Sequence, residues 1–332
     1  MRLSAFSVVD VAPGAEGRAA DRLLEVLGLG EAAEAAGLDA VWVAEHHFHD
    51  GGVCPSPPVL LAALAARTRR IAVGSMVSVL PFHDPIDLAE QYAMVDRISG
   101  GRLRLGVGSG YIPLEFEGFG VDPAVKRERF DRNLATLLAA FGGEEVRAEV
   151  ASARPVRTNV RPVQRPHPPL WVAAQRREAI PFVARRGASL ALIPYATVAD
   201  LAELKDEIQE FHDHRPAGGS GEVAAAVHIY SGEHVDRARA AFQRYLDARL
   251  ATQSTFYQEK VARHPHAASA RALEDAGFAY LGSPAEVETG LQQFADAGVD
   301  EVLGIFDFGG LSADEVARSV TALGRAWGAA GR

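Results

Sequence analysis

Short apolar runs, many of them β-branched, alternate with longer segments of helical periodicity along most of the 332 residues. A strand followed by a helix, repeated many times, indicates parallel strands joined by helical crossovers. The runs are almost continuously apolar, which is typical of strands covered on both faces. About eight such units favour a closed (β/α)₈ TIM barrel, and a doubly wound open sheet is the alternative.

The expected strands are Leu3–Val9, Ala40–Val43, Ile71–Val79, Leu103–Val107, Leu170–Ala173, Leu190–Ile193, Val223–Ile229 and Glu301–Phe306. The expected helices are Arg18–Ala36, Pro57–Ala66, Ile86–Ile98, Arg127–Phe141, Glu178–Arg186, Ala199–His212, Val235–Leu250, Ala285–Ala297 and Ala313–Trp327. Glycines stand after three of these helices, where a left-handed C-cap is wanted, and Ser-Pro or Asp-Pro pairs begin three helices, one of which also ends at such a glycine.

Two insertions interrupt the regular order. Residues 144–169 are proline-rich and alternating, which predicts an excursion with a small hairpin after the fourth strand. Residues 251–281 show little periodicity and lie between the seventh and eighth units, where they would cover the mouth of a barrel as a lid. No low-complexity linker divides the chain, so we expect a single domain over residues 1–332.

Composition excludes several classes of function. A formal net charge of -9 and a pI near 5.7 argue against a nucleic-acid partner, which selects basic surfaces. No apolar run approaches the roughly 18 residues that a membrane span needs. The first residues lack a long apolar stretch with a cleavage site, so we expect no signal peptide and a cytoplasmic location. Cys54 is the sole cysteine, which rules out internal disulfides and a cysteine-based metal site.

The end of the second expected strand carries the most distinctive group of ionisable side chains. Glu45, His46, His47 and His49 follow Ala40–Val43 almost directly. Histidine is the side chain that most easily changes protonation near neutral pH. Because parallel α/β folds bind ligands at the carboxyl ends of their strands, this segment is the first candidate for catalysis.

Paired histidines at the end of a barrel strand also suggest a metal-dependent hydrolase. Such a site needs further His, Asp or Glu ligands from other strand ends. The fourth strand ends in Gly108–Gly110 and the fifth in Ala174–Arg176, and neither segment offers a ligand. We therefore expect no metal, and we expect at least one histidine to serve only in hydrogen bonds at the rim.

The segment Gly106–Gly110 follows a strand and superficially matches a dinucleotide fingerprint. The third glycine of a G-x-G-x-x-G motif would fall on Tyr111, so the spacing is wrong. The segment also follows the fourth strand rather than opening a first βαβ unit. We expect no nicotinamide site here, although glycines at a strand end let a flat or phosphorylated ligand approach the backbone.

Four arginines stand at the start of two helices. Arg127 and Arg129 begin the helix after the fourth strand, and Arg176 and Arg177 begin the one after the fifth. A helix N-terminus favours anions, and arginine there opposes the helix dipole, so a bound phosphate is a reasonable explanation. Ordinary surface charge is the alternative for each of them.

Two other groups of reactive side chains have simpler explanations. His83 and Asp84 look like a catalytic dyad, but the sequence around them reads as a loop and a helix start, so Asp84 is expected to cap that helix. Cys54 lies in a loop, and the nearby histidines are its only distinctive neighbours in the sequence. We do not expect covalent catalysis by it.

Together these residues resemble the bacterial luciferase-like family of flavin-dependent oxidoreductases, the luciferase-like monooxygenases. The combination of Glu-His-His-Phe with Ser-Gly-Gly-Arg-Leu-Arg-Leu-Gly is specific, and the similarity is collinear over nearly the whole chain. The segments that carry it are Gly37–Phe48, His83–Arg104, Gly108–Gly120, Trp171–Gln175 and Gly282–Glu286.

The resemblance implies a (β/α)₈ barrel with reduced flavin mononucleotide, FMNH₂, at its C-terminal mouth. It places His46 beside the flavin ring as the catalytic residue, with Glu45 and His47 orienting or tuning it. It also implies a non-prolyl cis peptide near Met76 and Val77 that supports the isoalloxazine.

The resemblance further assigns the flavin phosphate to Arg127 and to groups after the fifth strand. The cofactor-binding residues that follow from it are Met76, Val77, Gly108, Ser109, Arg127, Ala174, Gln175 and Arg176. Luciferases carry an arginine where this chain has Ser109, so one phosphate contact is missing and Arg176 is expected to replace it. Their reactive cysteine is Gly108 here, so chemistry that depends on that thiol is not expected.

The activity implied is that of a two-component monooxygenase. A separate NAD(P)H:flavin reductase would supply FMNH₂, which reacts with molecular oxygen to a C4a-(hydro)peroxide that oxygenates a small organic substrate. The first alternative is a deazaflavin (coenzyme F420)-dependent oxidoreductase that transfers hydride. The doubled His46-His47 favours the flavin-dependent enzymes over this alternative. The second alternative is a non-catalytic flavin-binding protein. A homodimer is implied, and the substrate is left open.

Overall fold

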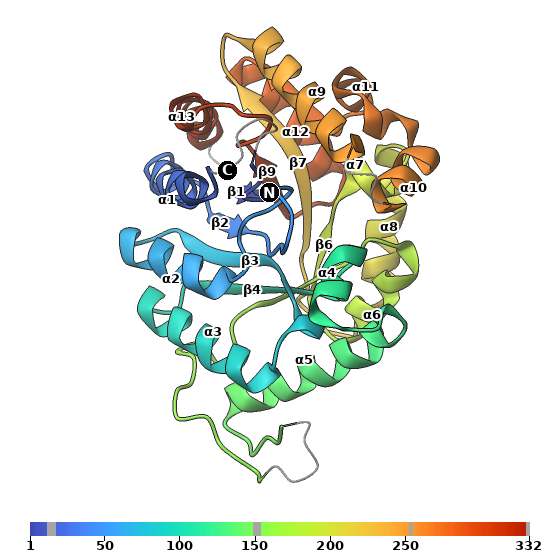
Figure 1. Ribbon diagram of the computed structural model, residues 1–332. Helices are drawn as coiled ribbons and strands as arrows, with labels where there is room; N and C mark the ends of the chain where they lie inside the picture. The colour runs from blue at the N-terminus through green and yellow to red at the C-terminus, as the bar shows by residue number, and fades with distance from the viewer. Residues whose placement is uncertain (12–17, 149–153, 252–254, 330–332) are drawn as a thin grey trace.

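Among the described residues, eight parallel strands close into a barrel in the computed structural model, and helices surround them (Figure 1). The structure describes residues 1–11, 18–148, 154–251 and 255–329. The strands follow one another around the barrel in chain order from β1 to β7, and β9 lies between β7 and β1. The predicted (β/α)₈ TIM barrel is therefore confirmed.

The strands are β1 (Arg2–Ser7), β2 (Ala40–Val43), β3 (Ala72–Val79), β4 (Leu103–Gly108), β5 (Leu170–Ala173), β6 (Ser189–Leu192), β7 (Val223–Ser231), β8 (Ala279–Gly282) and β9 (Glu301–Ile305). The helices are α1 (Ala19–Ala35), α2 (Pro57–Arg67), α3 (Pro85–Ser99), α4 (Pro113–Phe119), α5 (Lys126–Gly142), α6 (Ile180–Arg185), α7 (Pro194–Thr197), α8 (Leu201–His214), α9 (Val235–Ala251), α10 (Thr255–Arg263), α11 (Ala270–Asp275), α12 (Pro284–Ala297) and α13 (Ala313–Ala329).

All eight strands and nine helices expected from the pattern are present, with ends shifted by a few residues. Residues 251–281, in which the sequence pattern predicted no helix or strand, contain α10 and α11, and β8 begins there. β8 pairs with the last residues of the long strand β7, outside the closed ring.

Local caps explain where several helices begin and end. The Asp84 side chain accepts hydrogen bonds from the backbone N–H groups of Ile86 and Asp87, at 2.8 and 3.1 Å. Asp84 therefore caps α3 as predicted. Ser283 forms a complete capping box with Glu286 at the start of α12.

Glu301 fills the end of the barrel opposite the mouth. It is fully buried, and its carboxylate accepts hydrogen bonds from Trp42 at 2.9 Å and Ser4 at 2.7 Å. Arg104 and Arg2 supply positive charge at 2.9 and 3.0 Å. A buried carboxylate needs such partners, and the arrangement closes this end, so ligands must enter at the carboxyl ends of the strands.

The two insertions differ in their relation to the barrel. The described residues of the segment 144–169 project away from the body (Figure 1) and contain an antiparallel bridge between Val146 and Val156, consistent with the small predicted hairpin. Residues 149–153 of this insertion lie outside the described residues. In the other insertion α10 packs against α9 beside the mouth, and residues 252–254 lie outside the described part.

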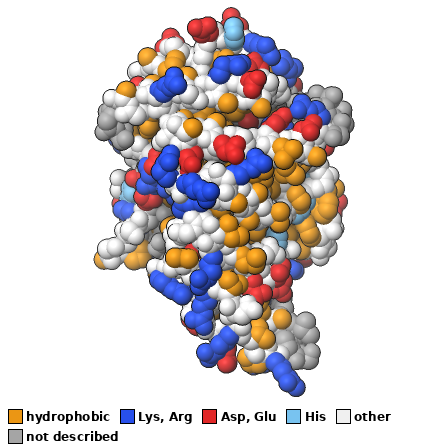
Figure 2. Space-filling model, turned by 90° about the vertical axis from the view of Figure 1, so that its left-hand side faces the viewer, with side chains coloured by type: hydrophobic (Ala, Val, Ile, Leu, Met, Phe, Trp, Pro, Cys, Tyr) orange, Lys and Arg blue, Asp and Glu red, His pale blue; other side chains and the backbone are white. Residues whose placement is uncertain are grey.

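One side of the molecule is rich in exposed apolar side chains. Figure 2 shows them gathered on the face that carries α1, α2 and α3. Leu24, Val59 and Met94 of these helices are 61%, 70% and 54% exposed. In the described part of the chain, no helix is both long and apolar enough to cross a membrane.

Candidate active site

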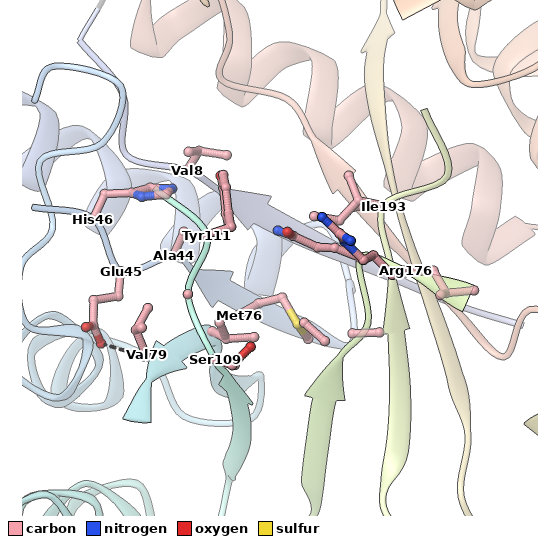
Figure 3. A pocket seen from close by; sticks show the side chains of 18 of the residues that line it. Val8, Ala44, Glu45, His46, Met76, Val79, Ser109, Tyr111, Arg176 and Ile193 are labelled. Atoms are coloured by element: carbon pink, nitrogen blue, oxygen red, sulfur yellow. Dashed lines mark hydrogen bonds between the residues drawn. The ribbon is translucent and has the colours of Figure 1, made fainter. Parts of the chain in front are cut away.

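A cavity of about 520 Å³ opens at the carboxyl ends of the strands. Figure 3 shows His46 and Tyr111 on one side of it and Arg176 on the other, with Met76 and Ser109 lower in the view. The sequence-predicted residues that line it are Glu45, His46, Met76, Val77, Gly108, Ser109, Arg127, Gln175 and Arg176. Among the described residues, His47 and Ala174 do not line it.

The loop after β2 is held by one carboxylate from α4. Glu115 Oε1 lies 3.0 Å from His46 Nδ1 and 3.3 Å from His49 Nε2, and it accepts a hydrogen bond from the His47 backbone N–H at 3.0 Å. Burial opposes ionisation of Glu115, but the hydrogen bonds from His46 and His49 prevail and lower its pKa to about 2. Glu115 is therefore an anion at neutral pH.

His46 is consequently a neutral imidazole with a defined proton. Burial lowers the pKa of His46 below its usual value, although Glu115 opposes the shift. A carboxylate partner at Nδ1 assigns the proton to that atom, which leaves the lone pair on Nε2. The ring lines the cavity, so it offers one proton acceptor to a bound molecule.

The Glu45 carboxylate connects side chains and backbone at the carboxyl ends of β2 and β3. Its Oε1 lies 3.0 Å from His47 Nε2 and 2.8 Å from His83 Nε2, and its Oε2 accepts a hydrogen bond from the Val79 backbone N–H at 3.1 Å. Burial opposes ionisation of Glu45, but the hydrogen bonds from His47 and His83 outweigh it and lower its pKa. This network ties β2 to the end of β3.

His47 lies away from the cavity, behind the loop. Its ring meets Phe119 edge-on at 4.6 Å between centroids and Phe82 at 6.1 Å. The direct neighbours of His46 in the cavity come from other elements: Tyr111 follows β4, and its ring centroid lies 6.3 Å from that of His46.

The glycines of β4 allow this strand to approach β3 closely. A Cβ at Gly106 would collide with the carbonyl oxygen of Ser75, and a Cβ at Gly108 would lie 2.6 Å from Val77 Cγ2. The peptide bond between Met76 and Val77 is cis, where the resemblance placed it. Glycine is needed here for the approach of β3, whereas the sequence suggested only the approach of a ligand.

Three cations gather at the far end of the cavity. Arg127 and Arg176 line it together with Lys126, the first residue of α5, which the sequence reasoning did not select. Burial lowers the pKa of Lys126, and the positive charges of Arg176 and Arg127 lower it further. A phosphate would offset this repulsion and accept hydrogen bonds from all three side chains. This end of the cavity therefore fits a phosphorylated cofactor.

Of the four arginines at the two helix starts, two line the cavity and two do not. Arg129 and Arg177 lie outside the lining among the described residues, and Arg177 pairs with Glu210 at 2.6 Å. Arg127 stacks its guanidinium over the Phe182 ring at 3.7 Å. The sequence pattern identified the two helix starts, but it could not tell which arginine at each start lines the cavity.

The sequence analysis missed a second group of cavity residues, which comes from α7, α9 and α10. Tyr195 of α7, Tyr245 and Arg249 of α9 and Tyr257 of α10 line the cavity on the side of His46 and Tyr111. Only Tyr257 had been noted, as part of a lid. Nothing in the spacing of these residues indicates that they meet, because they lie on separate elements with different periodicities.

The strand ends Gly108–Gly110 and Ala174–Arg176 offer no metal ligand, as expected, but a carboxylate from a neighbouring helix does lie beside the histidines. Donor atoms of His46, His49 and Glu115 lie within 4.8 Å of one another. Glu115 comes from α4, a short helix that had not been expected after the fourth strand. The two imidazoles hydrogen-bond to the same carboxylate oxygen, so the three form a hydrogen-bonded cluster. Cys54 is buried, and burial raises its pKa to about 12, which leaves it unreactive.

Comparison with known proteins points to one family. The sequence model of the luciferase-like monooxygenases matches residues 1–301. An uncharacterised protein of Sinorhizobium fredii, y4wF, is 35% identical over 69% of this chain and 67% of its own length. The oxygenase component of the flavin-dependent trigonelline monooxygenase of Acinetobacter baylyi is 31% identical over 51% of this chain. The match covers 48% of that relative, so the chain aligns with about half of its length.

Solved structures agree on the fold. The monooxygenase RslO1 from Streptomyces bottropensis superposes with a TM-score of 0.85 at 26% identity, and the match covers 100% of both chains. An F420-dependent secondary alcohol dehydrogenase superposes with a TM-score of 0.72 at 16% identity, over 97% of this chain and 98% of its own. The second likeness extends to the fold alone.

Proposed function

Because the chain belongs to the luciferase-like monooxygenase family, whose members are flavin-dependent oxidoreductases, we propose that it is an FMNH₂-dependent monooxygenase. The observation that carries the proposal is a single cavity with a neutral histidine at one end and three cations at the other. A separate NAD(P)H:flavin reductase would supply the reduced cofactor, as the name of the Acinetobacter oxygenase component suggests.

The residues that would hold the flavin come from β3, β4, β5 and α5. Lys126, Arg127 and Arg176 would bind the phosphate, with Gln175 and Ser109 beside them. Met76, Val77 and Gly108 would lie against the ring system. Ala174 lies outside the lining among the described residues, so any contribution it makes is through the position of Gln175.

The chain's own chemistry centres on His46. Reduced flavin activates molecular oxygen for transfer to an organic substrate, and the cofactor supplies this step. His46 Nε2 can hold or move a proton at the reacting atoms, while Glu115 fixes the ring through Nδ1. Glu45 and His47 support the loop behind it, which makes them positioning residues in this proposal. The apolar cavity walls exclude water from the reacting centre.

Rapid mixing tests the proposed function. Protein loaded anaerobically with FMNH₂ is mixed with oxygenated buffer, and absorbance is followed against free FMNH₂. We expect a slow phase with a transient absorbance that free flavin lacks. Oxidation with the time course of free flavin and no flavin retained by the protein would exclude the proposal, and retained F420 would instead favour the hydride-transferring alternative. Tight retention of oxidised FMN with no effect on the reaction with oxygen would favour a non-catalytic binding protein.

A further inference from the structure

We propose that His46, His49 and Glu115 form a reversible inhibitory site for a divalent transition-metal ion such as Zn²⁺. The ion would replace the hydrogen bonds that now join these three side chains. The binding site is argued from geometry alone, whereas its effect on the reaction rests on the proposed function.

The donor atoms of the three side chains converge on one point. His46 Nδ1 and His49 Nε2 lie 3.0 and 3.3 Å from the same atom, Oε1 of Glu115. Donor atoms of all three residues lie within 4.8 Å of one another. Ligands of a tetrahedral zinc ion, with bonds of about 2.0–2.2 Å, lie roughly 3.3 Å apart. Two separations therefore already suit a common ion, and the partly exposed His49 can complete the set by a small rotation.

Two of the donors are already in the state that a metal ion binds. Glu115 is an anion at neutral pH and His46 is uncharged, and metal ions bind ligands in these deprotonated forms. Two imidazoles with one carboxylate suit zinc and its neighbours in the transition series, whereas Mg²⁺ and Ca²⁺ prefer oxygen ligands throughout.

Access and local charge make the site reversible. His46 and Glu115 line the cavity, so an ion can reach them from its mouth. Water would complete the coordination, as it does where a protein supplies three ligands. Arg249 is near enough for its positive charge to act on His46, and this charge opposes the ion. We therefore expect binding that a chelator reverses.

The network around Glu45 provides an internal contrast. His47 Nε2 and His83 Nε2 lie 3.0 and 2.8 Å from Glu45 Oε1, so the same residue types are present there. Among the described residues, only the group with Glu115 brings three donors within 4.8 Å of one another. His83 is a matched control for His49, because both side chains are 23% exposed and each contacts one buried carboxylate.

Coordination would change what His46 offers to a bound molecule. Its neutral ring carries one proton, which lies on Nδ1 in the hydrogen bond to Glu115. With a metal ion on Nδ1, this proton moves to Nε2 and the ring stays neutral. The proton acceptor that the proposed reaction uses is then lost, so the metal-bound protein should be inhibited.

Equilibrium dialysis of the full chain against Zn²⁺, without flavin, tests the site. We expect a zinc ion that His49→Gln and Glu115→Gln bind at least about tenfold more weakly than the wild type, since even an indirect partner is worth about 10–100-fold in metal affinity. His83→Gln should bind zinc like the wild type. The visible absorption of bound Co²⁺ should be lost in His49→Gln and should persist in excess Mg²⁺. Melting curves confirm that the variants are folded.

Undiminished zinc affinity in both His49→Gln and Glu115→Gln, or an equal loss in His83→Gln, overturns the site. For the inhibition, protein loaded with FMNH₂ is mixed with oxygenated buffer, with and without saturating Zn²⁺. Zinc should lengthen the protein-dependent phase at least about tenfold, and EDTA should reverse this. An unchanged phase with the site filled overturns the inhibition. Absence of any such phase in the metal-free wild type counts against the proposed function instead, and dialysis still decides the site.

Discussion

The proton on the His46 ring is positioned by Glu115, a residue sixty-nine positions away in the sequence. Burial keeps the ring neutral, and Glu115 fixes the proton on Nδ1. A ring with one free acceptor atom in a largely apolar cavity suits proton transfer better than a charged imidazolium, which could only donate. The adjacent His47 has a different task, since its ring packs against Phe82 and Phe119.

His46→Ala should separate binding from chemistry. We expect the variant to bind FMNH₂ nearly as well as the wild type, because the phosphate partners are untouched. The protein-dependent slow phase after mixing with oxygen should lengthen at least about tenfold, since general acid–base groups contribute about 10²–10⁴-fold to the rate of the steps they assist. His167→Ala, far from the cavity lining, serves as the control. An unchanged slow phase in His46→Ala would remove His46 from the chemistry.

Lys260 gives the protein a pH dependence that can be measured without any ligand. Burial, with a smaller effect of Arg249, lowers its pKa to about 7. Between about pH 7 and 10.5 the unfolded chain holds a proton that the folded protein does not, so stability rises with pH in this window. Lys260→Met should remove a slope of about 1 kcal/mol per pH unit from the free energy of unfolding.

Urea unfolding at several pH values between about 7 and 10 measures this slope. Exposed Lys205→Met is the control and should leave it unchanged. If the wild type and Lys260→Met show parallel pH dependence, Lys260 is protonated in the folded protein and the stated pKa direction is wrong.

At the residue scale, the sequence predicted the side chains that follow a strand directly. Glu45, His46, Ser109 and Arg176 all line the cavity, because a strand end fixes the place of the next few residues. Glu115, Lys126 and Arg249 were missed as site residues. They reach the cavity from helices, where the face that points inward depends on how the helix packs, and the chain pattern does not contain that information.

At the element scale, β3 and β4 show how the barrel makes room for a ligand. The two strands approach so closely that a Cβ at Gly106 would collide with the Ser75 carbonyl oxygen, and the register between them shifts between Ser75 and Ser78. The irregularity lies where the cavity wall passes from β3 to β4. The amphipathic helices and the eight strands of the barrel were predicted, whereas two elements were not: α4, whose seven residues span only about two turns, and β8, which lies outside the closed ring.

The start of α5 should act as the phosphate site. Replacing Arg127 and Arg176 together by glutamine removes two cations, so we expect FMN binding to weaken at least about tenfold. Riboflavin, which lacks the phosphate, should bind the variant and the wild type alike. Arg185→Gln on the exposed part of α6 is the control. Equal losses for FMN and riboflavin would show that the arginines support the fold of the site and do not contact the phosphate.

At the scale of the whole molecule, the two ends of the closed barrel differ: one is closed by a buried ion-pair network, and the other holds the cavity. Glu301 and its partners close one end, and the cavity occupies the other. The alternation of strands and helices favoured this architecture over a doubly wound open sheet, because short crossovers and parallel pairing leave few other arrangements. Exposed apolar side chains gather on the face of α1, α2 and α3, and we propose that the homodimer implied by the resemblance forms through this face.

Sedimentation of the purified protein tests the dimer. We expect a species of twice 35.4 kDa that becomes a monomer when Val59 and Met94 are replaced together by glutamate. Both side chains are more than half exposed, so the change should not disturb the fold of the chain itself. A wild-type monomer at micromolar concentration would show that this face serves another purpose.

The central claim is that the mouth of the barrel is a site for reduced FMN beside His46. Anaerobic equilibrium dialysis against equal concentrations of reduced FMN and reduced F420 tests it most directly. We predict that the protein retains reduced FMN, that F420 does not compete, and that the double variant of Arg127 and Arg176 retains neither. Retention of F420 in preference to FMN, or of neither cofactor by the wild type, would contradict the account.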